Sequence, residues 1–228
     1  MNLRFWSLIL GWTLLVGPQL SPAQAPPNLV GQQDSRKWEK DIQAFEASDQ
    51  TNRPPKGCIV FVGSSSIRMW SSLKNDFPGL PVVNRGFGGS ELADSVNFAE
   101  RIILPYEPRE VVIYAGANDL ANGKSPEIAF GDFVALYGKI HEHLPNTKVV
   151  FIATAPNPSR WKIVDKMRKF NALVEDYCRQ RDVIFVDVFS LMLGPDGKPK
   201  PDIYRDDGLH MNAKGYVIWK EALAPYVR

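Results

Sequence analysis

Three adjacent serines, Ser64, Ser65 and Ser66, follow Gly63 at the end of an apolar run. A serine hydroxyl at a strand-to-helix turn can act as a nucleophile when a neighbouring base removes its proton. The same serines can instead cap the helix that follows, which is a purely structural role. The segment departs from the Gly-x-Ser-x-Gly nucleophile motif, because Ile67 stands where the second glycine would be. A catalytic role therefore depends on a base elsewhere in the chain.

A candidate base lies near the C-terminus, in the segment Asp206-Asp-Gly-Leu-His210. Asp207 and His210 are three positions apart in a predicted turn, which is close enough for the carboxylate to hold the imidazole. A catalytic triad needs this contact, because it fixes the tautomer of the histidine and stabilises the imidazolium. The other two histidines, His141 and His143, lie near the polar end of a predicted helix and are interpreted as solvated surface residues.

Two further segments carry polar groups after apolar runs. Asn84-Arg-Gly-Phe-Gly-Gly-Ser90 contains glycines that permit tight backbone geometry and leave N–H groups open to a ligand. A turn that merely needs positive φ explains the same glycines. In Gly116-Ala-Asn118-Asp119, the Asn118 side chain can offer its NH₂ group to a developing oxyanion. Asp119 is predicted to pin a loop by bonding its own backbone.

The elements that must position these groups follow from the apolar pattern. Short, nearly continuous runs rich in Val, Ile and Phe predict five strands buried on both faces, at residues 58–62, 81–84, 111–115, 149–154 and 183–188. Helices are predicted over residues 37–48, after a cap at Ser125, over Ile163 to Tyr177, and after a cap at Asn212. Alternating strands and helices imply a parallel sheet between helix layers, with ligands bound beyond the carboxyl ends of the strands. The polar segments above follow those strand ends.

The N-terminus has the pattern of a secretory signal peptide, because Arg4 precedes the apolar run 5–17 and small residues follow at 21–25. Cleavage is expected after Ala23 or Ala25, and the run falls short of the roughly 20 residues that span a bilayer. A buried N-terminal helix is the alternative. We therefore expect a secreted or periplasmic protein without stable membrane insertion after cleavage.

Composition narrows the class of partner. The net charge of +2 predicts neither nucleic-acid binding nor polybasic membrane adhesion. Cys58 and Cys178 are the two cysteines and are interpreted as core thiols, with a disulfide between them as the alternative. Two cysteines and three histidines make a His/Cys zinc site unexpected.

Taken in order, the four polar segments resemble the SGNH hydrolases, also called the GDSL esterase/lipase family. The matching blocks are Gly63-Ser-Ser65, residues 84–89, Gly116-Ala-Asn118-Asp119 and Asp207-Gly-Leu-His210, so the resemblance spans residues 58–216. The likeness extends to the bacterial branch related to the catalytic subunits of platelet-activating-factor acetylhydrolase. Ser64 and Ser66 replace the Asp and Leu of Gly-Asp-Ser-Leu, so the assignment of the nucleophile to Ser65 rests on Gly63.

The resemblance implies a three-layer α/β/α sandwich with a five-stranded parallel sheet, the flavodoxin-like SGNH fold. Together with the N-terminal signal pattern, it predicts division into a signal peptide (1–25), a leader and helix (26–57) and an SGNH hydrolase domain (58–228). A serine esterase with a Ser65, Asp207 and His210 triad is expected, and the resemblance places its oxyanion hole at the N–H groups of Ser65 and Gly89 and the side chain of Asn118. No metal or organic cofactor is required, and the partner is a small-molecule or glycan ester.

The loops favour short acyl groups, because the connections at the strand ends are short or polar and none looks like an apolar lid. Acetylated carbohydrates are one substrate class of this kind. The alternatives are a lysophospholipase or lipase of the same family, a flavodoxin-like phosphate-binding module, and a non-catalytic carbohydrate-binding relative. The sequence by itself identifies neither the natural substrate nor the oligomeric state.

Overall fold

The computed structural model describes residues 34–228. The predicted signal peptide, residues 1–25, and the first part of the leader lie outside the described residues. Within residues 34–228, no helix combines the length and the apolar character that a membrane crossing requires.

A single parallel sheet organises the described residues, in the order β2-β1-β3-β4-β5. This is the flavodoxin-like order expected for a doubly wound fold. The strands are β1 (Ile59–Gly63), β2 (Val82–Gly86), β3 (Glu110–Tyr114), β4 (Lys148–Ile152) and β5 (Val183–Val186). All five predicted strands are confirmed, with ends shifted by one or two residues. Val188 was predicted in β5 but begins a helix, because the Asp187 side chain caps that helix at the N–H of Ser190.

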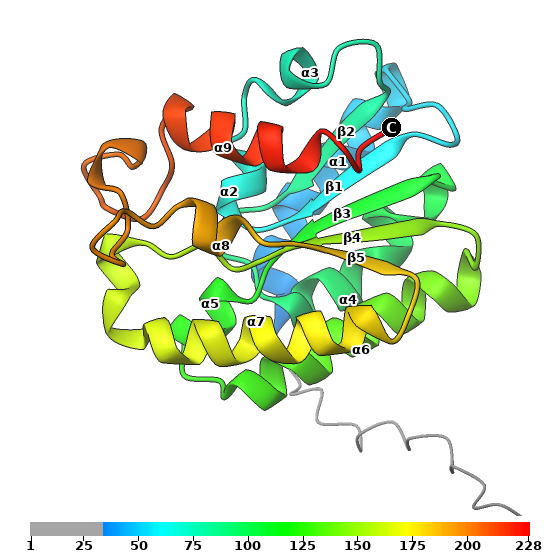
Figure 1. Cartoon of the computed structure of the whole chain (residues 1–228). Coiled ribbons are helices and arrows are strands. Elements are labelled where there is room, and N and C mark those ends of the chain that lie inside the picture. Colours follow the sequence, from blue (N-terminus) through cyan, green and yellow to red (C-terminus); the bar gives the residue numbers. More distant parts are fainter. Residues whose placement is uncertain (1–33) are drawn as a thin grey trace, which may run out of the picture.

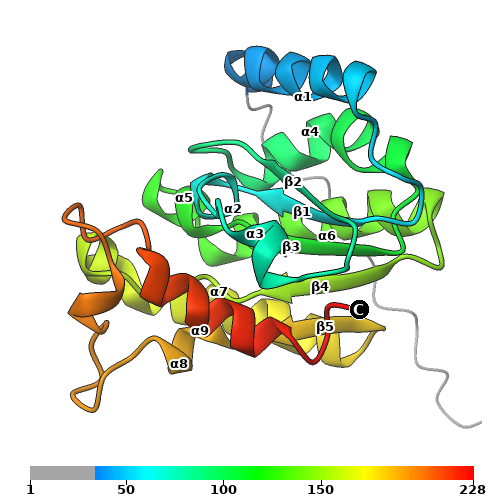
Figure 2. The same cartoon turned by 90° about the horizontal axis from the view of Figure 1, so that it is seen from above.

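Helices cover both faces of the sheet, which confirms the three-layer sandwich (Figure 1). One face carries α4 (Leu92–Ile102), α6 (Pro126–His143) and α7 (Val164–Arg179). The other carries α9 (Ala213–Leu223) with the short α2 (Ser65–Arg68) and α3 (Leu73–Asp76). Helix α1 (Glu39–Thr51) lies outside the sandwich against α4 (Figure 2).

Short elements complete the loops. They are α5 (Ala117–Ala121), α8 (Val188–Leu191) and the 3-10 helices η1 (Ser35–Trp38), η2 (Leu104–Tyr106), η3 (Pro158–Ile163) and η4 (Pro201–Ile203). The predicted caps are confirmed, since the Ser125 side chain accepts from the N–H of Ile128 and Asn212 accepts from Lys214. Helix α4 was not predicted. It begins with a capping box between Glu91 and Asp94.

The core explains why the strand sequences are continuous rather than alternating. Every residue of β1 and β3 is buried, because helices pack on both faces of these strands. Under α9, the rings of Trp70, Tyr216 and Trp219 pack together, with Phe61 against Trp70. Cys58 and Cys178 are both buried free thiols, as predicted for core cysteines.

Candidate active site

The turn after β1 sets the position of Ser65. Gly63 adopts a φ of +142°, and a Cβ atom there would lie 1.9 Å from the carbonyl oxygen of Tyr114 on β3. Only glycine fits this close approach of two strands. The chain then turns through Ser64, whose N–H donates to the Tyr114 carbonyl, and Ser65 becomes the first residue of α2. The Ser65 side chain thus lies at the carboxyl end of the strand.

Ser65, His210 and Asp207 form one hydrogen-bonded line. The Oγ atom of Ser65 is 3.0 Å from Nε2 of His210, and Nδ1 of His210 is 2.6 Å from Oδ2 of Asp207. The other carboxylate oxygen of Asp207 accepts the backbone N–H groups of Leu209 and His210 at 2.8 and 2.9 Å. The hydrogen bond from the His210 ring, with these backbone bonds, lowers the pKa of Asp207 to about 2. Asp207 is therefore ionised near neutral pH, as a partner of an imidazolium must be.

The loop that carries Asp207 and His210 is held from several sides. The Arg205 N–H donates to the His210 carbonyl at 2.8 Å, which closes the loop on itself. The N–H of Ser159, in the loop before α7, donates to the Gly208 carbonyl at 3.0 Å. These loops, with α2 and α5, gather at the carboxyl ends of the strands, on the left of Figure 1. The fold therefore brings together segments that are far apart in the sequence.

The groups predicted to bind an oxyanion lie around the same turn. The backbone N–H groups of Ser65 and Gly89 donate to no acceptor within residues 34–228. The Asn118 Nδ2 atom donates to the Ser90 carbonyl at 2.9 Å, next to Gly89. Asn118 and Ser65 both line the pocket that contains His210, whereas Gly89 is not among the lining residues. The second N–H of the Asn118 amide remains available for a ligand.

The loop with Gly89 is supported by the N-terminal segment. Gly89 has a φ of +76°, and a Cβ atom there would lie 3.2 Å from the indole ring of Trp38 in η1. The Trp38 ring also packs edge-on against Phe87, with ring centroids 5.9 Å apart. The sequence did not predict this contact between the leader and the glycine segment.

A buried charge cluster joins Glu91, which directly follows the glycine-rich segment 84–90, to α5. Lys124 lies 2.9, 3.1 and 2.6 Å from carboxylate oxygens of Glu91, Asp119 and Asp132. The prediction that Asp119 bonds its own backbone was wrong, since its carboxylate accepts the N–H of Leu92 instead. Burial raises the pKa of Asp119 to about 6, against the opposing effect of the Lys124 ammonium. The cluster holds the start of α4 beside the helix that carries Asn118.

Arg160 is a pocket residue that sequence reasoning missed. It lies in η3, and its Nη2 atom donates to Oδ1 of Asn118 at 2.8 Å. Its backbone N–H donates to Oδ1 of Asn157, which caps η3. The available signal was the segment Asn157-Pro-Ser-Arg160, because a capped turn a few residues after a strand lies at the edge where ligands bind.

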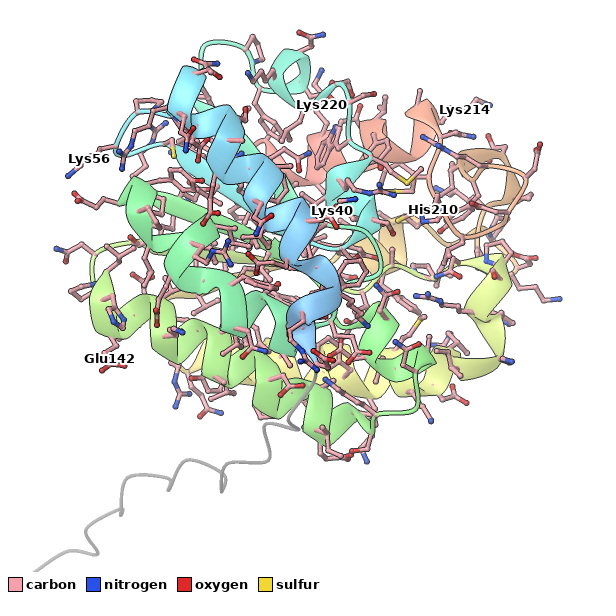
Figure 3. The ribbon with its side chains drawn as sticks, turned by 180° about the vertical axis from the view of Figure 1, so that it is seen from behind. Lys40, Lys56, Glu142, His210, Lys214 and Lys220 are labelled. Carbon is pink, nitrogen blue, oxygen red and sulfur yellow. The ribbon has the colours of Figure 1, made fainter. Side chains whose placement is uncertain are left out.

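His141 and His143 are exposed surface residues, as predicted, and neither lines this pocket. Both are exposed near the end of α6, and Glu142 between them is on the opposite side of the molecule from His210 (Figure 3). The His141 ring stacks on Tyr137, with centroids 5.5 Å apart.

Comparison with known proteins identifies the family. A sequence profile of the GDSL-like lipase/acylhydrolase family matches residues 60–218. The chain belongs to this family. As a family member it is a carboxylic ester hydrolase, which argues against the alternative of a flavodoxin-like binding module.

Several solved structures share the fold of this chain. A proposed platelet activating factor protein from Streptococcus pneumonia superposes with a TM-score of 0.74 at 20% identity, covering 85% of this chain and 94% of that one. A GDSL-like lipase from Bacteroides thetaiotaomicron gives 0.68 at 20% identity, covering 88% and 98%. A mutant of the acetyl-xylooligosaccharide esterase from Geobacillus Stearmophilus gives 0.64 at 15% identity, covering 76% and 95%. At these identities the similarity concerns the fold.

One curated protein also matches part of the chain. An isoprenyl transferase from Porphyromonas gingivalis is 27% identical over 112 residues, which make up 46% of this chain and 44% of that protein. The chain thus matches less than half the length of this relative, and the match carries no transferase activity over to it.

Proposed function

We propose that this esterase is a secreted or periplasmic enzyme that hydrolyses short-acyl esters with Ser65 as nucleophile. The observation that carries this proposal is the line from Ser65 Oγ to His210 Nε2 at 3.0 Å and from His210 Nδ1 to Asp207 at 2.6 Å. With Nδ1–H directed at the carboxylate, the Nε2 lone pair faces the serine hydroxyl. Export rests on the signal pattern of residues 1–25.

The reaction follows from this geometry. His210 takes the proton of Ser65 as Oγ attacks the ester carbonyl, and Asp207 stabilises the imidazolium that forms. The developing oxyanion accepts hydrogen bonds from the N–H groups of Ser65 and Gly89 and from the Asn118 amide. The alcohol leaves with the proton from His210. Water then attacks the acyl-enzyme with His210 again acting as base, and the free acid and serine are regenerated.

The pocket size supports a short acyl group. The pocket beside Ser65 encloses only about 20 Å³, little more than the space that one water molecule requires. Its lining is largely polar, with Ser64, Ser66 and Asn157 alongside Asn118. Each additional methylene gains about 0.8 kcal/mol only where apolar surface receives it. Acetyl esters, whose acyl tail is a single methyl group, suit a pocket of this size, and acetylated carbohydrates are the substrate class that we propose.

Covalent labelling tests the assignment of the nucleophile. A fluorophosphonate should modify Ser65 alone, as located by mass spectrometry of the digested protein. Ser65→Ala should lose ester hydrolysis by several orders of magnitude, because no other hydroxyl of residues 34–228 is bonded to His210. Ser64→Ala and Ser66→Ala are matched controls and should retain most of the activity. An adduct on Ser64 or Ser66 would contradict the assignment.

A further inference from the structure

The catalytic pocket contains a cation without an acidic partner. Among the residues that line it, Arg160 is the one side chain with a permanent charge. No carboxylate of residues 34–228 lies within ion-pair distance of its guanidinium, 4.0 Å or less. Other half-buried or buried arginines are paired, as Arg85 is with Asp49 and Arg101 with Glu39. The unpaired charge is therefore a feature of the pocket.

Arg160 is nevertheless held firmly in position. Its Nη2 atom donates to Asn118 Oδ1 at 2.8 Å, and its backbone is fixed by the Asn157 cap at 2.9 Å. The bond to Asn118 uses one of the five N–H donors of the guanidinium. The remaining side-chain nitrogens donate to no acceptor in the described part of the chain. Removing a guanidinium from water without an anionic partner is unfavourable, and burial lowers the pKa of Arg160 for this reason.

The acidic groups nearest in sequence to the site do not neutralise this charge. Asp207 is committed to His210 and to two backbone N–H groups. Asp206 is exposed in the same loop, next to Arg205. Arg68, one turn after Ser65, also has no carboxylate partner in the described structure, and its guanidinium lies against Gly88. The surroundings of the catalytic serine therefore favour negative charge on a ligand.

We propose that Arg160 binds a carboxylate of the substrate, so that the preferred esters are acidic. A guanidinium fork matches a carboxylate in two parallel hydrogen bonds, and its free donors suit this geometry. Because Arg160 touches Asn118 of the predicted oxyanion hole, the carboxylate lies a few bonds from the scissile carbonyl. The inference rests on the proposed function of Ser65. The carboxylate belongs either to the alcohol part or to the acyl part of the ester.

Two pairs of esters that differ in charge test the proposal and separate these sources. 4-Acetoxybenzoate against 4-acetoxybenzamide varies the alcohol part, and the p-nitrophenyl monoester of glutarate against p-nitrophenyl pentanoate varies the acyl part. For each pair the ratio of kcat/KM, anionic over neutral, is compared between wild type and Arg160→Met. Because the same two esters are compared on both forms of the enzyme, the difference in their intrinsic reactivity cancels. A charge-assisted hydrogen bond predicts that the ratio falls about tenfold or more in one pair.

Controls give each outcome a meaning. Lys162→Met removes a charge from an exposed position of the same η3 segment and should leave both ratios unchanged. If Arg160→Met slows both members of each pair equally, Arg160 only positions Asn118 and the proposal is overturned. If Arg160→Met does not fold, product inhibition of the wild type decides, since 4-hydroxybenzoate must then inhibit more strongly than 4-hydroxybenzamide, or glutarate, with its second carboxylate, more strongly than pentanoate. Absence of any ester hydrolysis by the wild type would instead refute the proposed function.

Discussion

Replacing Asp207 by asparagine tests the catalytic line most sharply. Oδ1 of Asp207 accepts two backbone N–H groups, at 2.8 and 2.9 Å, so the oxygen of an asparagine must remain in that place. The amide NH₂ then occupies the Oδ2 position, 2.6 Å from Nδ1 of His210. Two donors cannot bond each other, so the imidazole must change to the tautomer with the proton on Nε2. That proton faces Ser65 Oγ at 3.0 Å, and the histidine can no longer act as base.

The expected loss is large because the geometry is preserved while the proton is misplaced. A wrong tautomer costs about 10³–10⁴ in kcat, or roughly 4–5.5 kcal/mol of transition-state stabilisation. The Asp207 side chain is 46% exposed, so the melting temperature should change little. Initial rates with p-nitrophenyl acetate give kcat, and thermal unfolding shows that the variant is folded.

The neighbouring residue provides the matched control. Asp206→Asn makes the same chemical change one position earlier, at an exposed carboxylate in the same loop. It should retain kcat within about twofold, since surface substitutions away from the site have small effects. A kcat for Asp207→Asn within tenfold of wild type, or an equal loss for Asp206→Asn, would contradict the assigned role of Asp207.

Three further predictions concern pH, folding and acyl length. Since hydrogen bonds hold the pKa of Asp207 at about 2, its carboxyl should stay ionised well below the ordinary value of 3.8, and a pH titration of its side-chain carbon signal by NMR measures this; a midpoint at or above 3.8 would contradict it. Gly63→Ala places a Cβ 1.9 Å from a carbonyl oxygen at a φ of +142°, so it should lower the free energy of unfolding by about 3–5 kcal/mol. Gly131→Ala, at a helical position with no atom near the added Cβ, should not lower it. Urea titration measures the free energy of unfolding of both variants. Among p-nitrophenyl esters of two to sixteen carbons, kcat/KM should be highest at two to four, and a maximum at twelve or beyond would indicate a lipase.

Local signals in the sequence determined much of the fold and the candidate site. The five strands were predictable because strands buried on both faces must be apolar throughout. The helix starts at Ser125 and Asn212 were predictable because a cap acts on its own next turn. The block that contains Asp207 and His210 was predictable as a pair, since its hydrogen bonds join residues three apart. Helix α4 was missed because its start depends on Glu91, an uncommon capping residue.

Which side chains meet at the edge of the sheet depends on long-range packing. Ser65 and His210 are 145 positions apart, and their contact depends on the strand order and on how the loop before α9 is held. The ion pair of Lys124 with Glu91 and the bond between Arg160 and Asn118 join different loops in the same way. The apolar periodicity and the capping residues of a sequence predict the structure of one segment, without its contacts to other segments. The meeting of such segments is determined by packing, so the unpaired charge of Arg160 could be recognised only after every carboxylate around it had been placed.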